Sequence, residues 1–150
     1  MPAGLPIRNR QLQEKEQIMG TYKTIEEARE YFSGDRFATT NGMVIDELEE
    51  DRCVCSMDLR EDHKNGTGTV MGGVMFTLAD FALAVISNHI YHPSVAQELS
   101  IHFLTVPRGD RLTAEAVCVK SGKRTTVLRI SVRDGEGREA AILSGTSAKL

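Results

Sequence analysis

Cysteine, proline and aromatic residues are scarce in this sequence, and tryptophan is absent. Three cysteines, four prolines and 5% aromatic residues occur among 150 residues. A small, odd number of cysteines argues against a disulfide framework and for a reducing compartment, so we expect a cytoplasmic location. The N-terminal segment, MPAGLPIRNRQLQEKEQ, has no apolar stretch of the kind that a secretory signal peptide requires.

Excess charge of one sign and long uninterrupted apolar segments are also missing. The net charge is −3, so no basic field favours a nucleic-acid partner. The most apolar run, residues 74–86, is too short for a confident membrane span and contains Asp80. We therefore expect neither a nucleic-acid partner nor a membrane.

The histidines and cysteines show no spacing typical of metal ligands. Residues 52–60 alternate between apolar and polar, with Cys53 and Cys55 on the apolar face. Because free cysteine is readily buried, we interpret both as core residues of a strand rather than as ligands. We expect no metal and no cofactor.

The overall composition is that of one globular domain, with 41% hydrophobic and 26% charged residues. Residues 1–23 are polar and mixed in charge, and we expect an N-terminal arm that is mobile or forms a short helix. Thr24 and Glu27 have the spacing of a capping box. We therefore place the folded domain at residues 24–150, beginning with a short helix.

The segment 65–89 is the one around which the sequence is organised. It begins with a loop that contains four glycines and continues as a run that is almost wholly apolar. A helix that is apolar on all sides belongs inside a protein, so we predict a buried helix over roughly residues 72–88. An unpaired Asp80 inside such a helix would be costly.

Alternating apolar and polar residues predict strands before and after this helix. The predicted strands cover residues 43–48, 52–60, 95–104, 112–118, 126–132 and 138–149. A short helix, two strands, a long helix and four further strands indicate an α+β fold with an antiparallel sheet. We expect the long helix to lie across one face of that sheet.

The residues around the long helix match a family pattern. Asn65 is followed by a glycine-containing loop, by Met71-Gly72-Gly73 and then by Leu78-Ala79-Asp80. With this pattern the chain, over roughly residues 24–150, resembles hotdog-fold acyl-CoA thioesterases of the phenylacetyl-CoA thioesterase type. The resemblance implies a sheet wrapped around a central helix, an acyl-CoA substrate and a homodimer or a dimer of dimers. The chain departs from the pattern at Met71, where the family usually has a histidine that supports the loop or the substrate carbonyl.

Thioester hydrolysis needs a group that activates or replaces water, and donors for the developing oxyanion. Asp80 is the candidate base or nucleophile; a structural carboxylate paired with a backbone group or a cation is the alternative. The N–H of Gly73 is the candidate oxyanion donor, because helix N-termini carry unpaired N–H groups. Gly72 would shape the approach to it, and tight packing of these glycines against a strand is the alternative.

Two further polar residues lie near these groups. Thr77 is three residues before Asp80 and shares its helical face. Asn65 would orient the attacking water or the thioester, or would only form the turn next to Gly66.

Substrate contacts are also expected from the strands that follow. Gln97 is polar on an otherwise apolar strand face, so it reaches the pocket or is a satisfied core amide. Lys123 and Arg124 flank a hairpin turn and would hold coenzyme A phosphates, or are simply solvated. His63 is a weak substitute for the missing histidine, since eight positions separate it from Met71.

Helix geometry predicts an oligomer. Asp80 follows Gly73 by seven residues, which is about 10 Å along a helix that rises about 1.5 Å per residue. One carbonyl group cannot touch both residues of the same chain. We therefore expect Asp80 and Gly73 of one site to come from different subunits, in agreement with the dimers that the resemblance implies.

The leading hypothesis for function is hydrolysis of an acyl-CoA thioester to free acid and coenzyme A. The alternative is a hotdog protein that binds acyl-CoA without turning it over, which Met71 favours. A hydratase on the same fold is a third hypothesis, for which the sequence offers no suitably spaced Asp/His pair.

Overall fold

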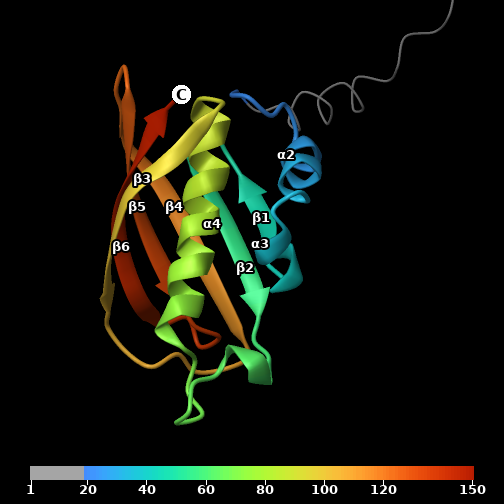
Figure 1. Cartoon of the computed structure of the whole chain (residues 1–150), viewed down its shortest axis with the longest axis vertical. Coiled ribbons are helices and arrows are strands. Elements are labelled where there is room, and N and C mark those ends of the chain that lie inside the picture. Colours follow the sequence, from blue (N-terminus) through green and yellow to red (C-terminus); the bar gives the residue numbers. More distant parts are fainter. Residues whose placement is uncertain (1–18) are drawn as a thin grey trace, which may run out of the picture.

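A six-stranded antiparallel sheet and one long helix form the body of the protein (Figure 1). The computed structural model describes residues 19–150. The strand order is β1-β2-β4-β5-β6-β3, and α4 (Gly72–Ile90) lies across one face of the sheet. The strands are β1 (Val44–Leu48), β2 (Arg52–Asp58), β3 (Ser94–Phe103), β4 (Arg111–Ser121), β5 (Thr125–Arg133) and β6 (Glu139–Lys149). The predicted α+β architecture is confirmed.

Helix α4 is the core of the fold, as predicted from its composition. It extends two residues beyond the predicted end, and most of its side chains are buried. Among the described residues, α4 is long and apolar enough to count as a membrane span by composition, but the greater part of it is covered by the rest of the fold. The sheet therefore supplies the apolar surroundings that its sequence requires.

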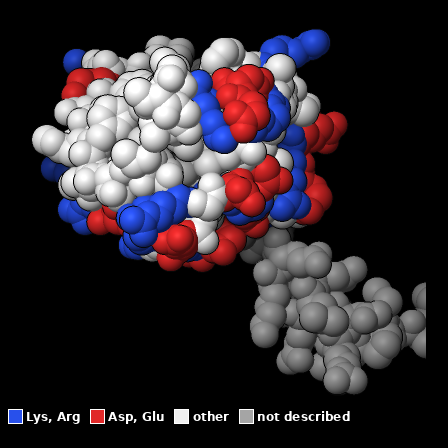
Figure 2. Space-filling model, turned by 90° about the horizontal axis from the view of Figure 1, so that it is seen from below, with Lys and Arg blue, Asp and Glu red and all other residues white. Residues whose placement is uncertain are grey.

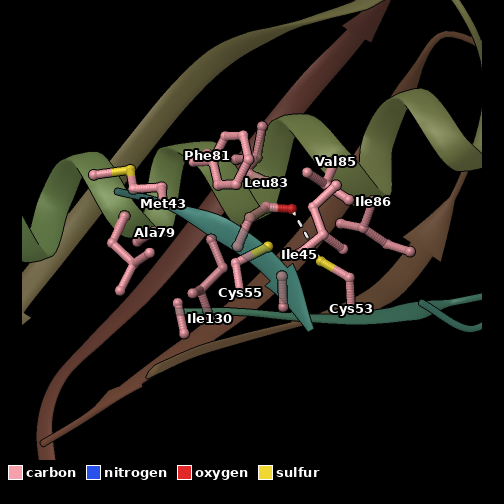
Figure 3. Packing of buried hydrophobic residues seen from close by; sticks show 14 of the residues in the cluster. Met43, Ile45, Cys53, Cys55, Ala79, Phe81, Leu83, Val85, Ile86 and Ile130 are labelled. Carbon is pink, nitrogen blue, oxygen red and sulfur yellow. Dashed lines mark hydrogen bonds between the residues drawn. The ribbon is translucent and has the colours of Figure 1, made fainter. Parts of the chain in front are cut away.

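Cys53 and Cys55 lie in the core beneath α4, as Figure 3 shows. The Sγ atom of Cys53 donates a hydrogen bond to the carbonyl oxygen of Ala82, at 3.3 Å. This bond joins β2 directly to the middle of α4. The interpretation of these cysteines as core residues is confirmed, and no group of potential metal ligands occurs within residues 19–150.

Strand β3 forms one edge of the sheet, and its alternation is less regular than predicted. A bulge between Ala96 and Glu98 interrupts its pairing with β6 and leaves Gln97 exposed. Leu99 packs against the core, whereas the side chain of Val95 is 48% exposed. The predicted face, apolar except for Gln97, is thus wrong for this strand, because an edge strand with a bulge does not bury all of one face.

Two short helices precede the sheet. Helix α2 (Ile25–Phe32) begins as predicted at Thr24, whose Oγ1 accepts a hydrogen bond from the N–H of Glu27 at 3.2 Å. Helix α3 (Arg36–Thr40) is not predicted from the sequence, because five residues are too few to show helical periodicity. It contacts α4 and so forms part of the surroundings of Asp80.

The expected N-terminal arm is described only in part, since residues 1–18 lie outside the described residues. Residues 19–23 contact the end of α4. The N–H of Thr21 donates to the carbonyl oxygen of His89 at 2.8 Å, and the N–H of Tyr22 donates to its Nδ1 at 3.3 Å. The ring of Tyr22 also stacks on His89, with 5.8 Å between centroids. This part of the expected arm therefore packs against the core.

Candidate active site

Helix α4 begins without a side-chain cap. Met71 is its N-cap residue and accepts no hydrogen bond through its side chain. The N–H groups of Gly72 and Gly73 have no acceptor within residues 19–150. Unpaired N–H groups and the helix dipole together favour an oxyanion at this point.

Met71 lies directly beside these donors. A Cβ atom placed on Gly73 would lie 3.1 Å from the Cε of Met71, and one placed on Gly72 would lie 2.9 Å from the ring of Phe103. Gly72 therefore packs tightly against Phe103 of β3, as the packing alternative predicts, whereas Gly73 is exposed, with the Met71 thioether along one side. The side chain of Met71 is 55% exposed and can move aside.

A cavity of about 270 Å³ opens at this end of α4, and we call it the Gly73 cavity. Three methionines and Phe37 form much of its apolar lining, and Thr77 and His63 contribute polar groups. The methionines are Met43, Met57 and Met71. Flexible thioether side chains suit a binding space for apolar groups of varied shape.

His63 lines this cavity but is already engaged. Its Nδ1 accepts a hydrogen bond from the N–H of Arg60 at 3.0 Å, so Nε2 carries the proton and donates to the Oδ1 of Asn41 at 3.1 Å. The ring is 3% exposed, and this burial lowers the pKa of His63. The neutral ring therefore holds η1 (Glu61–His63) in place, and nothing in its contacts directs it toward Gly73.

Asn65 shapes the glycine loop. Its Oδ1 accepts hydrogen bonds from the N–H of Thr67 at 3.0 Å and from the N–H of Thr69 at 3.2 Å, and also from both threonine hydroxyls. The Asn65 oxygen is thus used within its own turn, as the turn interpretation predicts.

Asp80 lies on the third turn of α4, half-buried, at a separate cavity of about 430 Å³ that we call the Asp80 cavity. Burial raises the pKa of its carboxyl above the ordinary value, and the negative charge of Asp35 raises it further. No residue of the described chain donates a hydrogen bond to this carboxylate or forms an ion pair with it. The structural alternative, an Asp paired with a cation or backbone donors, therefore has no partner within residues 19–150.

Thr77 and Phe37 line both cavities and separate them within one chain. The Oγ1 of Thr77 donates to the carbonyl oxygen of Gly73 at 2.7 Å, which joins the two turns of the helix. Gly73 and Asp80 thus lie on one helix but at different cavities. A single chain does not bring the candidate donor and the candidate base to one point.

The remaining candidate residues lie farther away. Gln97 is exposed at the β3 bulge, and Lys123 and Arg124 are exposed in the hairpin between β4 and β5. In Figure 1 this hairpin lies at the end of the molecule where α4 ends, opposite Gly73. At the other end, acidic and basic side chains are interspersed over part of the surface (Figure 2). Near the glycine loop, Arg60 forms an ion pair with Asp62, and Lys64 with Glu61.

Asp35, the N-cap residue of α3, is a lining residue of the Asp80 cavity that sequence reasoning missed. The segment Ser33-Gly34-Asp35 indicates only a turn, and an aspartate there is ordinarily a helix cap. The sequence carries no signal that it lies near Asp80.

Comparison with known proteins identifies the family. A family model described as "Thioesterase superfamily" matches residues 67–141. Over 131 residues the chain is 30% identical to the acyl-coenzyme A thioesterase PaaI of Escherichia coli, which covers 87% of this chain and 94% of that protein. The solved structure of E. coli PaaI, from the phenylacetic acid degradation operon, superimposes with a TM-score of 0.78 at 31% identity, over 82% of this chain and 90% of that one. The TT0310 protein of Thermus thermophilus gives a TM-score of 0.73 at 32% identity, over 77% of this chain and 98% of that one.

The matched residues 67–141 contain α4, β3, β4 and β5. The expected hotdog fold is confirmed. The chain belongs to the thioesterase superfamily.

Proposed function

We propose that this protein hydrolyses an acyl-CoA thioester to the free acid and coenzyme A, with Asp80 and the N–H of Gly73 as the reacting and stabilising groups. Two features of residues 19–150 carry the proposal: the N–H groups of Gly72 and Gly73 have no acceptor there, and the half-buried Asp80 has no partner there. The acyl-coenzyme A thioesterase named among its relatives supports the substrate class.

In the proposed reaction, water attacks the carbonyl carbon of the thioester while Asp80 accepts its proton. The raised pKa of the Asp80 carboxyl makes it a better proton acceptor than an ordinary aspartate. The N–H of Gly73 stabilises the negative charge on the carbonyl oxygen. When the tetrahedral intermediate collapses, the C–S bond breaks and coenzyme A leaves as a thiolate, which takes up the proton.

We propose that the complete site forms between two subunits of a homodimer, which in turn is able to pair into a dimer of dimers. Support comes from the two separate cavities and from the helix rise, which puts Gly73 and Asp80 about 10 Å apart. Edge strand β3 offers unpaired backbone groups through which two sheets would join.

Within this site we assign supporting roles to the other candidate residues. Met71, Gly72 and Thr77 border the carbonyl-binding point, and Asn65 holds the loop that leads to it. Gln97 on β3, and Lys123 and Arg124 on the hairpin, would contact the substrate across the dimer. The two cations suit coenzyme A phosphates, because hydrogen bonds to phosphate from charged donors are strong.

A second candidate function is acyl-CoA binding without turnover. The observation in its favour is Met71, whose thioether lies beside Gly73 where related enzymes are expected to have a histidine. Met71→His separates the two functions: in a weakened enzyme it should raise turnover only while Asp80 is present. In a protein that only binds acyl-CoA, Met71→His should give no turnover, whether it is made in the parent or in the Asp80→Asn variant.

The proposal is tested by Asp80→Asn, assayed against a panel of acyl-CoAs with a thiol-detecting dye. The amide keeps the size of the carboxylate but accepts no proton, so turnover should fall by about 10²–10⁴-fold. Thermal stability should not fall, because burying an amide costs less than burying a carboxylate. A variant that melts earlier and still hydrolyses acyl-CoA at the parent rate would end the catalytic assignment.

A further inference from the structure

A second carboxylate lies at the cavity that contains Asp80. Asp35 comes from the turn between α2 and α3 and lines the same cavity of about 430 Å³. Although it is the N-cap residue of α3, its side chain makes no capping hydrogen bond. Asp35 also forms no ion pair with any described residue. Its charge is therefore not used by the local fold.

The charged groups facing Asp80 are few. Helix α3 and the turn before it contribute Asp35 and Arg36, and these are the charged residues of the described chain that line the cavity together with Asp80. The buried neighbours of Asp80 on α4 are apolar: Leu78, Ala79 and Phe81, of which Phe81 also lines the cavity. Partial burial raises the pKa of Asp35, and the pKa of Asp80 is raised by burial and then by the charge of Asp35.

We propose that Asp35 is a positioning residue for hydrolysis, which acts across the Asp80 cavity to keep Asp80 a strong proton acceptor. This inference rests on the proposed function. Asp35 is exposed and Asp80 is half-buried, and two carboxylates that line one cavity disfavour each other's ionisation. The turn between α2 and α3 thus contributes to catalysis without touching the substrate.

The proposal predicts two opposite effects of Asp35→Asn on the pH profile of kcat/KM. Without the charge at residue 35, Asp80 loses its proton more easily, so the acidic limb should move to lower pH. On the plateau, where Asp80 is ionised in both proteins, a weaker base should work more slowly. The profiles of the parent and the variant should therefore cross, with the variant faster at low pH and slower near neutral pH.

Glu30→Gln is the matched control, since it removes an equal charge from an exposed position of α2 that does not line the cavity. Glu30→Gln should change neither the position of the acidic limb nor the height of the plateau in the pH profile of kcat/KM. A merely structural role for Asp35 would instead scale kcat/KM by one factor at every pH. Such a uniform change, or an unmoved profile, would overturn the proposal.

Carbon-13 NMR titration of the Asp80 carboxyl gives a readout that needs no turnover. Its midpoint should move to lower pH in Asp35→Asn and stay in place in Glu30→Gln; equal midpoints in all three proteins would refute the coupling. If Asp80→Asn is inactive while Asp35→Asn leaves both the profile and the midpoint unmoved, the present inference alone fails. If Asp80→Asn hydrolyses acyl-CoA at the parent rate, the proposed catalytic carboxylate fails, and the role of Asp35 fails with it.

Discussion

Gly73 carries two roles at once, as the second residue of α4 and as the proposed oxyanion donor. Its φ angle is not in the left-handed region, so alanine is compatible with the backbone there. An added Cβ would meet only the flexible end of Met71, at 3.1 Å. Helix geometry therefore does not require glycine at this position; under the proposed function, glycine leaves the N–H group accessible to the substrate.

Gly73→Ala should consequently leave the melting temperature unchanged or raise it slightly, since alanine favours a helix by roughly 0.5–1 kcal/mol relative to glycine. Turnover should fall by about tenfold or more, because the methyl group narrows the approach to the donor. Gly66→Ala, at a loop position where a Cβ would meet nothing within 4 Å, is the control and should keep the parent rate. Equal rates for the two variants would remove Gly73 from the site.

The packing of α4 on the sheet depends on a small residue in β6. A Cβ on Gly145 would lie 2.6 Å from the Cδ1 of Leu99 on β3, 2.8 Å from the Cδ1 of Leu83 on α4 and 3.1 Å from the carbonyl oxygen of Glu98. Glycine therefore lets the helix, β6 and edge strand β3 approach one another closely.

We expect Gly145→Ala to lower the free energy of unfolding by about 1–3 kcal/mol, because overpacking a dense core forces neighbouring atoms apart. Urea unfolding monitored by circular dichroism measures this change. Ser144→Ala, an exposed neighbour on the same strand, should shift the midpoint little. A Gly145→Ala variant as stable as the parent would show that α4 is free to retreat from the sheet.

Elements with long periodic patterns were predictable from the sequence, and short or locally determined ones were not. The all-apolar run predicted α4 to within two residues of its end, and alternating segments between turn residues predicted all six strands. Helix α3 was missed because five residues carry no period, and the β3 bulge was missed because the extra residue Gln97 leaves no mark in composition.

The candidate site residues differ in the same way. Gly73 and Asp80 were candidates from the sequence because they begin or interrupt a strongly apolar helix. Asp35 was not a candidate, since its place at the Asp80 cavity depends on how the turn between α2 and α3 folds back over α4. Asn65 had two interpretations, and only the positions of Thr67 and Thr69 show that its oxygen is occupied within its turn.

For the whole molecule we expect at least a dimer in solution. Light scattering should return at least twice the chain mass of 16.5 kDa at micromolar concentration. A mass of one chain would contradict a site shared between subunits.

Subunit mixing tests the shared site more directly. Asp80→Asn and Gly73→Val chains should each be inactive alone, the first without a base and the second with its donor blocked. Co-expressed, half of the random dimers are mixed, and each mixed dimer contains one intact site of two, so about a quarter of the parent activity should return. No recovery in isolated mixed dimers would place both groups in one chain.

Protonation of buried histidine should weaken the whole fold in acid. His89 is 0% exposed, and burial lowers its pKa below the ordinary 6.5. The unfolded chain therefore binds a proton more readily than the folded one, so this contribution to stability is complete above about pH 6.5 and is lost as the pH falls below it. His63, whose pKa burial also lowers, adds in the same direction.

Urea unfolding at about pH 7.5 and pH 5.5 measures this effect. The free energy of unfolding should be lower at the acidic pH, and the difference should be smaller in His89→Gln than in the parent. His102→Gln, at an exposed position of β3, should lose as much as the parent. If acid lowers the free energy of unfolding equally in all three proteins, protonation of His89 does not contribute to the pH dependence of stability.

At the uncapped start of α4, a substitution that stabilises the helix is expected to reduce activity. A serine at position 71 would place a hydroxyl within reach of the N–H of Gly73 and stabilise the helix by about 0.5–2 kcal/mol. That hydroxyl would occupy the donor that the thioester oxygen is proposed to use. Directed evolution for thermal tolerance alone should therefore select serine, threonine or aspartate at residue 71. The resulting proteins should have a higher melting temperature and a lower turnover rate. Methionine, which offers no such acceptor, leaves the donor free for a substrate.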